Sequence, residues 1–153
     1  MRSDAERFLA LFVGSDEAHG IYNPQTAHKN PKSGKTEIKG SAATLVGPAT
    51  KELWQAHLRG EISLGIIPIR SDGTSYWGCI DVDDYTVNLA ALVAKIERLK
   101  LPLVVCRSKS GGGHVFLFLA EPQPARAVQE VLRNLADELG LSGCEIFPKQ
   151  AGV

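Results

Sequence analysis

The clearest hydrophobic pattern lies in the C-terminal half of the chain. Leu89, Leu92, Val93, Ile96 and Leu99 recur at helical spacing, and a second helical pattern begins after Pro124 and ends at Gly140. Apolar runs typical of buried strands cover residues 76–82, 103–106, 114–119 and 145–147. The resulting order is strand, helix, strand, strand, helix, strand. It predicts an α+β fold with a ferredoxin-like split core of the RNA-recognition-motif type.

The N-terminal part predicts an α/β extension of this core. Ser3 precedes an amphipathic pattern that ends at Gly14, and Pro48 precedes a second one that ends at Gly60. Residues 20–47 are rich in Asn, Pro, Gly, Ser and Lys without a sustained period, so we expect mostly loop with one strand at most. The apolar run 64–69 and the strand after the turn 71–74 are expected to form a hairpin.

Composition is that of one globular domain over residues 1–153, which we divide into helices and a lysine-rich loop in 1–60 and the main core in 61–150. Of its 153 residues 44% are hydrophobic, and the apolar stretches are too short to span a bilayer, so we expect a soluble cytoplasmic protein without membrane contact. Seventeen basic and seventeen acidic residues cancel, which argues against strong nonspecific nucleic-acid binding. Any such contact must be local.

Four lysines crowd the segment between the first two predicted helices: Lys29, Lys32, Lys35 and Lys39. Two interpretations stay open. The segment is either a solvated loop whose charges face water, or an arm that contacts the phosphates of a nucleic-acid strand.

Three carboxylates are expected to meet at one end of the core. Asp81 and Asp83 flank Val82 at the end of an apolar strand, so in regular strand geometry both point to one face. In the split arrangement the first and fourth strands are antiparallel neighbours, which brings Glu145 beside them. Clustered carboxylates next to an apolar strand need a cation, and two hard-oxygen-bound metals serve phosphoryl transfer. An isolated DxD pair would more often be a solvated turn.

The second candidate motif is the loop SKSGGGH at residues 108–114. Consecutive glycines let backbone N–H groups approach an anion, and the loop adds the hydroxyl, ammonium and imidazole donors of Ser108, Lys109, Ser110 and His114. We interpret it as a triphosphate-binding loop with Gly112 at its centre. It differs from a Walker loop because it leads into a strand. A flexible hairpin tip is the structural alternative.

The motifs CIDVDD, SKSGGGHVFLF and EIFPKQ, in this order and spacing, resemble the three signatures of the archaeo-eukaryotic primase superfamily. The similarity is closest to primase-polymerase domains of phages, plasmids and TOTE-type conflict systems, and HLRGEISLGIIPI extends it to about residues 37–150. The resemblance implies a DNA primase or polymerase that adds nucleoside triphosphates to a strand on a single-stranded DNA template or primer-template.

Residue roles follow from the same resemblance. Asp81 and Asp83 are expected to bind two Mg²⁺ or Mn²⁺ ions, Glu145 to complete the acidic set, and His114 with Ser110 or Lys109 to hold the phosphates of a dNTP or NTP. The family also suggests a helicase partner. Relatives continue with further strands beyond the position of Pro148, so the chain is also interpreted as a fragment of a longer protein.

Two alternatives and one geometric conflict remain at this stage. A nucleic-acid-binding module of the same fold, inactive or dependent on a partner, would carry the same motifs. A sugar-nucleotide transferase with a DxD pair fits poorly, because it explains neither SGGGH nor EIFPKQ. We further expect the first and third core strands to run parallel, which would place His114 away from Asp83.

Overall fold

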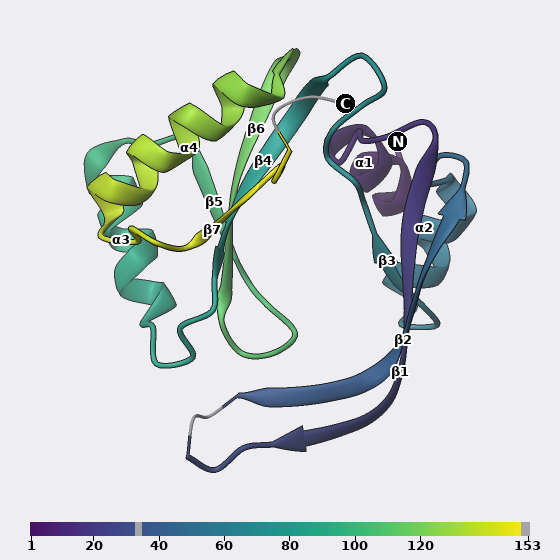
Figure 1. Ribbon diagram of the computed structural model, residues 1–153, viewed down its shortest axis with the longest axis horizontal. Helices are drawn as coiled ribbons and strands as arrows, with labels where there is room; N and C mark the ends of the chain where they lie inside the picture. Colours follow the sequence, from purple (N-terminus) through teal and green to yellow (C-terminus); the bar gives the residue numbers. More distant parts are fainter. Residues whose placement is uncertain (33–34, 151–153) are drawn as a thin grey trace.

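The computed structural model describes residues 1–32 and 35–150. Its mixed α+β fold contains two antiparallel sheets and four helices within these residues. Figure 1 shows an N-terminal module, a long hairpin that projects from it, and a C-terminal sheet whose two helices lie on the side away from that module.

The C-terminal sheet has the strand order β5-β6-β4-β7, and all of its pairs are antiparallel. The adjacency expected for the first and fourth strands is confirmed, because β7 pairs with β4. The elements of this part are β4 (Thr74–Val82), α3 (Leu89–Leu99), β5 (Leu103–Arg107), β6 (Gly113–Pro124), α4 (Ala125–Leu139) and β7 (Glu145–Phe147).

The main hydrophobic core lies between this sheet and the helices α3 and α4. Alternate residues of β4 and β6 point into it, among them Ile80 and Val115, both fully buried. Leu132 of α4 is equally buried and packs against them. Helix α4 ends where the sequence predicts, because Gly140 adopts a left-handed conformation directly after it. Helix α3 begins after Asn88, whose side chain accepts a hydrogen bond from the Ala91 amide.

The N-terminal module combines α1 (Asp4–Leu11) and α2 (Lys51–Leu58) with a three-stranded sheet of order β2-β1-β3. The helix expected after Ser3 is present, and Ser3 and Glu6 form a reciprocal capping box at its start. The strands are β1 (Ala18–Lys29), β2 (Thr36–Val46) and β3 (Ser63–Gly65).

The expectation of a loop over residues 20–47 is wrong. Strands β1 and β2 form a long antiparallel hairpin, with a bulge between Pro24 and Thr26. Its outer part is exposed: every residue from 23 to 29 faces solvent. A ribbon that buries neither face needs no alternation of apolar and polar residues, so its sequence carries no strand period.

The expected pairing of residues 64–69 with the next strand is also wrong. Strand β3 pairs with β1, and residues 66–70 stay outside any strand. Pro68 has no N–H to donate to a ladder, and its carbonyl instead accepts a hydrogen bond from the buried Ser75 hydroxyl at 2.9 Å.

A cluster of aromatic rings joins the two parts of the molecule. Phe12, just after α1, packs edge-on against Trp77, Phe116 and Phe118 at centroid distances of 5.2–5.3 Å. The indole N–H of Trp77 donates to the Val13 carbonyl at 3.0 Å. These rings pack together on the face of the sheet that α3 and α4 leave uncovered, with Trp77 buried and the three phenylalanines partly buried.

Within the described residues, none of the helices has the length and apolar character required to cross a bilayer.

Gly78 provides a direct test of this packing. A Cβ atom there would lie 2.5 Å from a Leu132 methyl and 2.8 Å from the Phe147 carbonyl oxygen. We expect Gly78→Ala to lower the free energy of unfolding by about 1–3 kcal/mol, because either α4 or β7 must move. Denaturant unfolding measures the change. The matched control is Gly65→Ala, whose Cβ meets only ordinary contacts from 3.5 Å; an equal loss in both variants would contradict this packing.

Candidate active site

One row of residues crosses the C-terminal sheet and defines the candidate site. Asp81 of β4 lies directly opposite His114 of β6 on one side and opposite Glu145 of β7 on the other. Directly opposed residues of antiparallel strands point to the same face. All three side chains therefore lie on the face away from α3 and α4, where the His114 ring packs edge-on against Phe116 of the aromatic cluster at a centroid distance of 5.7 Å.

This register corrects the expectation that the first and third core strands are parallel. Strands β4 and β6 run antiparallel. The start of β6 thus lies beside the end of β4, and the His114 Nε2 atom is 3.4 Å from Asp81 Oδ1. No bridging ligand is needed to bring the second motif to the first.

Asp81 is in an environment that disfavours its charge. Burial raises the pKa of its carboxyl group, and repulsion by Asp83 and Glu145 raises it further, while His114 and Lys149 oppose the effect. Its side chain is 25% exposed. Partly buried carboxylates that repel one another gain most from a bound cation.

Glu145 has a partner of its own. Its carboxylate lies 2.6 Å from the ammonium group of Lys149, four residues further on. Lys149 also lies over the Phe147 ring, with 5.1 Å to the centroid. Lys149, within the third motif, therefore offsets the charge of the Glu145 carboxylate.

Asp83 follows the end of β4 and is held by Tyr85. The tyrosine hydroxyl donates to Asp83 Oδ1 at 3.0 Å. Lys35 of the hairpin lies over the Tyr85 ring at 5.2 Å. A hydrogen bond to Tyr85 raises the pKa of Lys35, and the charges of Asp83 and Glu37 add to this effect.

The glycines of the loop 108–113 have structural roles. A Cβ at Gly112 would lie 2.2 Å from the Val82 carbonyl oxygen, so only glycine lets the loop pass the end of β4 this closely. Gly111 has a φ of 106°, which a residue with a side chain rarely adopts. The glycines thus bring the second motif against the first.

The polar residues of the loop differ in their exposure and partners. Ser108 is buried, and its hydroxyl is 3.2 Å from that of Ser110. Lys109 instead extends over the ring of Tyr22 in β1, with its Nζ atom 3.9 Å from the centroid. The loop also accepts a backbone hydrogen bond at Ser110 from Thr36 of β2, at 3.0 Å.

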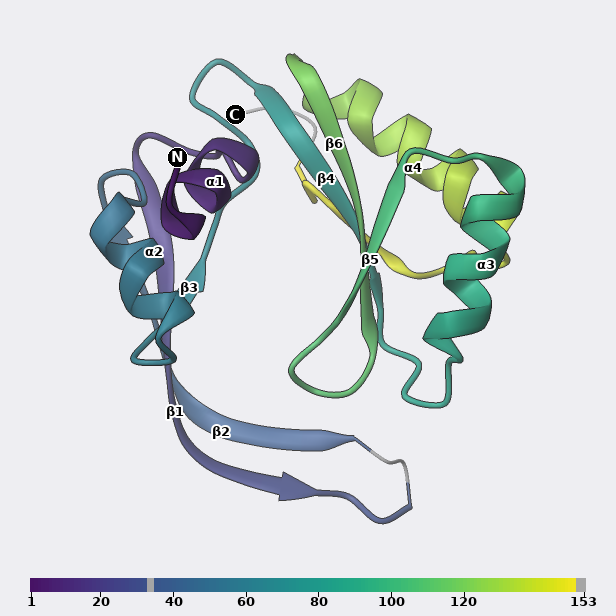
Figure 2. The same ribbon diagram turned by 180° about the vertical axis from the view of Figure 1, so that it is seen from behind.

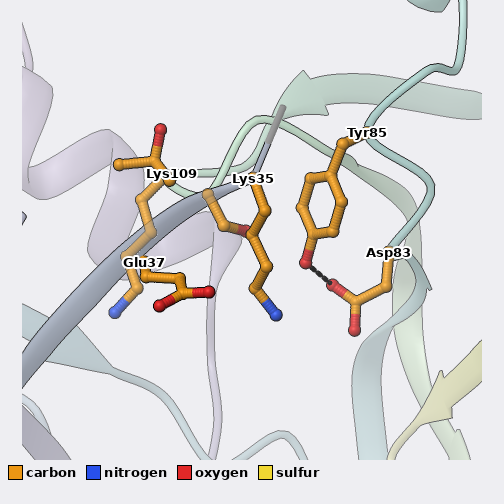
Figure 3. A pocket seen from close by; sticks show the side chains of 7 residues that line it. Lys35, Glu37, Asp83, Tyr85 and Lys109 are labelled. Carbon is orange, nitrogen blue, oxygen red and sulfur yellow. Dashed lines mark hydrogen bonds between the residues drawn. The ribbon is translucent and has the colours of Figure 1, made fainter. Parts of the chain in front are cut away.

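A pocket of about 310 Å³ lies where the hairpin meets this loop. Its walls are built by Lys35, Thr36, Glu37, Asp83, Tyr85, Lys109 and Ser110. Figure 3 shows Lys35 between Glu37 on one side and Asp83 with Tyr85 on the other. Three of the site residues that the sequence predicts, Asp83, Lys109 and Ser110, line this pocket. The row of Asp81, His114 and Glu145 lies beside it on the sheet.

Sequence reasoning missed the part of the pocket that the hairpin contributes. Tyr85 stands two residues after Asp83 and could have been suspected from that spacing alone. Lys35 was counted among the four lysines but not assigned to this pocket. Glu37 and Tyr22 carry no signal of their own, because their positions depend on a hairpin that the sequence does not predict.

The donor set suits a divalent cation in its chemistry. Asp81, Asp83 and Glu145 offer hard carboxylate oxygens of the kind that Mg²⁺ and Mn²⁺ bind. Within residues 1–32 and 35–150, however, no group of three or more His, Cys, Asp or Glu side chains is already arranged around a common point. Glu145 is turned to Lys149 and Asp83 to Tyr85. Binding of one cation by all three carboxylates would require these side chains to move toward a common point.

The sheet, the three carboxylates and the glycine loop together define a class: an α+β domain with an acidic site next to basic and hydroxyl donors. Comparison with family models identifies the class more closely. The model for the archaeo-eukaryotic primase domain of TOTE conflict systems matches residues 6–150, which is nearly the whole chain. The chain therefore belongs to this family.

Membership points to a primase or nucleotidyltransferase type of function. A comparison with curated proteins finds no match.

The environment of Asp81 predicts a gain in stability when its charge is removed. Because burial raises the pKa of the Asp81 carboxyl group above the ordinary value of an aspartate, the native state holds the proton more tightly than the unfolded chain. Stability is therefore lost as pH rises from near 3.8 through the folded pKa. Without divalent cations at pH 7, Asp81→Asn should raise the melting temperature by roughly 2 °C and remove this pH dependence.

Asp84→Asn is the matched control for that measurement. Hydrogen bonds from the Thr86 side chain and amide lower the pKa of Asp84, so its charge is favourable in the folded state. This variant should leave the melting temperature unchanged or lower it. A melting temperature that falls in Asp81→Asn as much as in Asp84→Asn would contradict the account of the Asp81 environment.

Proposed function

We propose that this domain is a template-dependent nucleotidyltransferase, a DNA primase or polymerase that initiates or extends a strand from nucleoside triphosphates. The observation that carries the proposal is the register of β4, in which Asp81 lies opposite both His114 and Glu145. One residue of each of the three sequence motifs thereby meets in one row. Family membership supports the same reaction class.

The strand order of the C-terminal sheet supports the finer fold assignment. In β5-β6-β4-β7 the first and third strands of the core are central, and a helix follows each of them in sequence. This is the order of a ferredoxin-like split βαββαβ core. We therefore assign residues 74–147 to such a core, and the first part of the chain to an α/β extension that contributes one wall of the pocket.

Asp81, Asp83 and Glu145 would hold the divalent cations, two Mg²⁺ or Mn²⁺ ions. Bound there, the ions would neutralise charge on the reacting phosphates and on both the attacking and leaving oxygens. The like charges that raise the pKa of Asp81 support this role, because a cation removes the repulsion among the three carboxylates.

The loop 108–114 and His114 would bind the triphosphate of the incoming nucleotide. Lys109 and Ser110 present an ammonium group and a hydroxyl at the pocket. His114, 3.4 Å from Asp81, stands between the phosphate donors and the acidic set. Ser108 would act through Ser110, because the two hydroxyl groups are hydrogen-bonded to each other. Gly112 would act by letting the loop approach Val82 closely.

The chemistry expected of the protein is positioning and charge stabilisation. The 3′-hydroxyl of a primer or initiating nucleotide attacks the α-phosphate in line, the bond to the β-phosphate oxygen breaks, and pyrophosphate leaves. His114, Lys109 and Ser110 hold the phosphates so that the attack geometry is met. Donors held by the surrounding fold would stabilise the charge that develops on the phosphates.

One observation favours a second candidate, a nucleic-acid-binding module of the same fold that has no activity of its own or gains it with a partner. Glu145 pairs with Lys149 at 2.6 Å, so the third carboxylate is already neutralised. If that pair persists in the presence of Mg²⁺ and nucleotide, the acidic set reduces to Asp81 and Asp83.

The first test removes one carboxylate charge. Asp81→Asn should lower incorporation of labelled nucleotides on a primed single-stranded DNA template at least about 100-fold with Mg²⁺ or Mn²⁺. Binding of the template, measured by fluorescence anisotropy, should change little. Asp84→Asn, one residue beyond the DxD pair, is the control and should retain activity. Unchanged incorporation in Asp81→Asn would overturn the site, and no incorporation by the wild type with either metal would favour the binding module.

The second test separates nucleotide binding from template binding. His114→Ala should raise the apparent KM for the nucleotide about tenfold or more, because a phosphate donor is lost, while the Kd for template stays within about twofold. Steady-state kinetics at saturating template gives the KM. Equal weakening of nucleotide and template binding would count against His114 as a phosphate ligand.

A further inference from the structure

The outer part of the β1–β2 hairpin, residues 23–32 and 35–41, is called the arm here. Residues 23–29 are all exposed, as are Glu37 and residues 39–41 on the opposite strand. A two-stranded ribbon that covers no core is only marginally stable in water. Such an element adds little to the stability of the domain, so its role is expected to lie in what it binds.

The arm carries a strong local charge. Residues 18–46 contain four lysines and a single acidic residue, Glu37, a formal charge of +3 in a chain whose net charge is zero. The rest of the chain therefore carries −3. The hairpin is a basic element on an otherwise acidic domain, so the overall neutral charge hides a local electrostatic preference.

The lysines are spread along the ribbon. Lys39 pairs with Thr26 across the hairpin, and Lys29 lies three residues further along β1, roughly 10 Å away at the rise of an extended strand. Lys32 follows beyond the end of β1. Because Thr26 and Lys29 are three residues apart, Lys39 and Lys29 project from opposite faces of the ribbon. Charges spread over this length and over both faces match a flexible polyanion better than a single phosphate group.

The position of the arm connects it to the candidate active site. Figures 1 and 2 show it curving from the N-terminal module past the ends of β4 and β6 that carry the site. Thr36 donates its backbone N–H to Ser110 of the phosphate loop at 3.0 Å, and Lys35 lies over the Tyr85 ring. The base of the arm therefore contacts the loop and the tyrosine that border the candidate site.

We propose that the arm binds the sugar-phosphate backbone of single-stranded nucleic acid through Lys29, Lys32 and Lys39, and thereby holds the template beside the site. This inference rests on the proposed function for the identity of the polyanion. The one large aliphatic residue in the sequence of the arm, Ile38, belongs to β2; the segment from Asn23 to Lys32 has amides, one hydroxyl group, an alanine, two prolines, His28 and two lysines. A protein partner would call for an apolar or aromatic anchor, which this segment does not offer.

The test is a salt series with a labelled single-stranded oligonucleotide, read by fluorescence anisotropy. For Lys29→Ala/Lys32→Ala/Lys39→Ala, the slope of log K against log salt concentration should fall by about 2, because three contacts at roughly 0.7 each are lost. The charge-matched control is Lys95→Ala/Arg98→Ala/Arg133→Ala, on the helices of the opposite face of the sheet. Its slope should equal that of the wild type, and both triple variants should melt within about 2 °C of it.

The outcomes distinguish this inference from the proposed function. The wild type could incorporate no nucleotide while the arm variant still binds the oligonucleotide more weakly than the wild type. That result would leave the arm inference standing and overturn the enzymatic proposal. An unchanged slope in the arm variant, or an equal fall in the control, would overturn the arm inference whatever the activity. Equal wild-type affinity for poly-glutamate and for the oligonucleotide at the same salt would assign the arm to acidic proteins and overturn it as well.

Discussion

Strand β4 hydrogen-bonds to β6 on one side and to β7 on the other, both antiparallel, and its register with them places the candidate site. Because side chains alternate along a strand, a shift by one residue would turn Asp81 into the hydrophobic core and bring Ile80 to the surface. The burial of Ile80 and Val82 under α3 and α4 fixes this register, so the apolar face of β4 determines where the charged face points.

Close packing holds the flanking motifs in place. Gly78 lets α4 and β7 approach β4, and the Gln129 side chain of α4 donates to the Pro148 carbonyl at 2.6 Å, which fixes the segment after Glu145. On the other side, Gly112 passes close to Val82, so that the loop before His114 reaches the end of the central strand. Unfavourable charge around Asp81 is thus maintained by packing elsewhere, as is common at functional sites.

The sequence predicts the C-terminal sheet well, because each strand and helix there buries one face and carries a clear period. It identifies the neighbouring positions of Asp81 and Glu145 for the same reason. It fails for the hairpin, whose exposed ribbon needs no pattern, and for the 66–70 segment, where Pro68 interrupts the apolar run. The expected parallel direction of β4 and β6 is wrong. Helix α3 returns the chain so that β5 runs in the same direction as β4, and the hairpin between β5 and β6 then makes β6 antiparallel to β4. The hairpin's contribution to the pocket, through Lys35, Glu37 and Tyr22, depends on tertiary pairing and leaves no trace in local sequence.

The central proposal is that Asp81, set between His114 and Glu145, forms a divalent-cation site on the face of the sheet away from α3 and α4. Paramagnetic broadening of histidine ring signals by Mn²⁺, followed by NMR, tests it without any assay of activity. The account predicts that the signals of His114 broaden at lower Mn²⁺ concentration than those of His57 on α2, and that Asp81→Asn removes the difference. Equal broadening of both histidines in the wild type, or selective broadening of His114 that persists in Asp81→Asn, would contradict it.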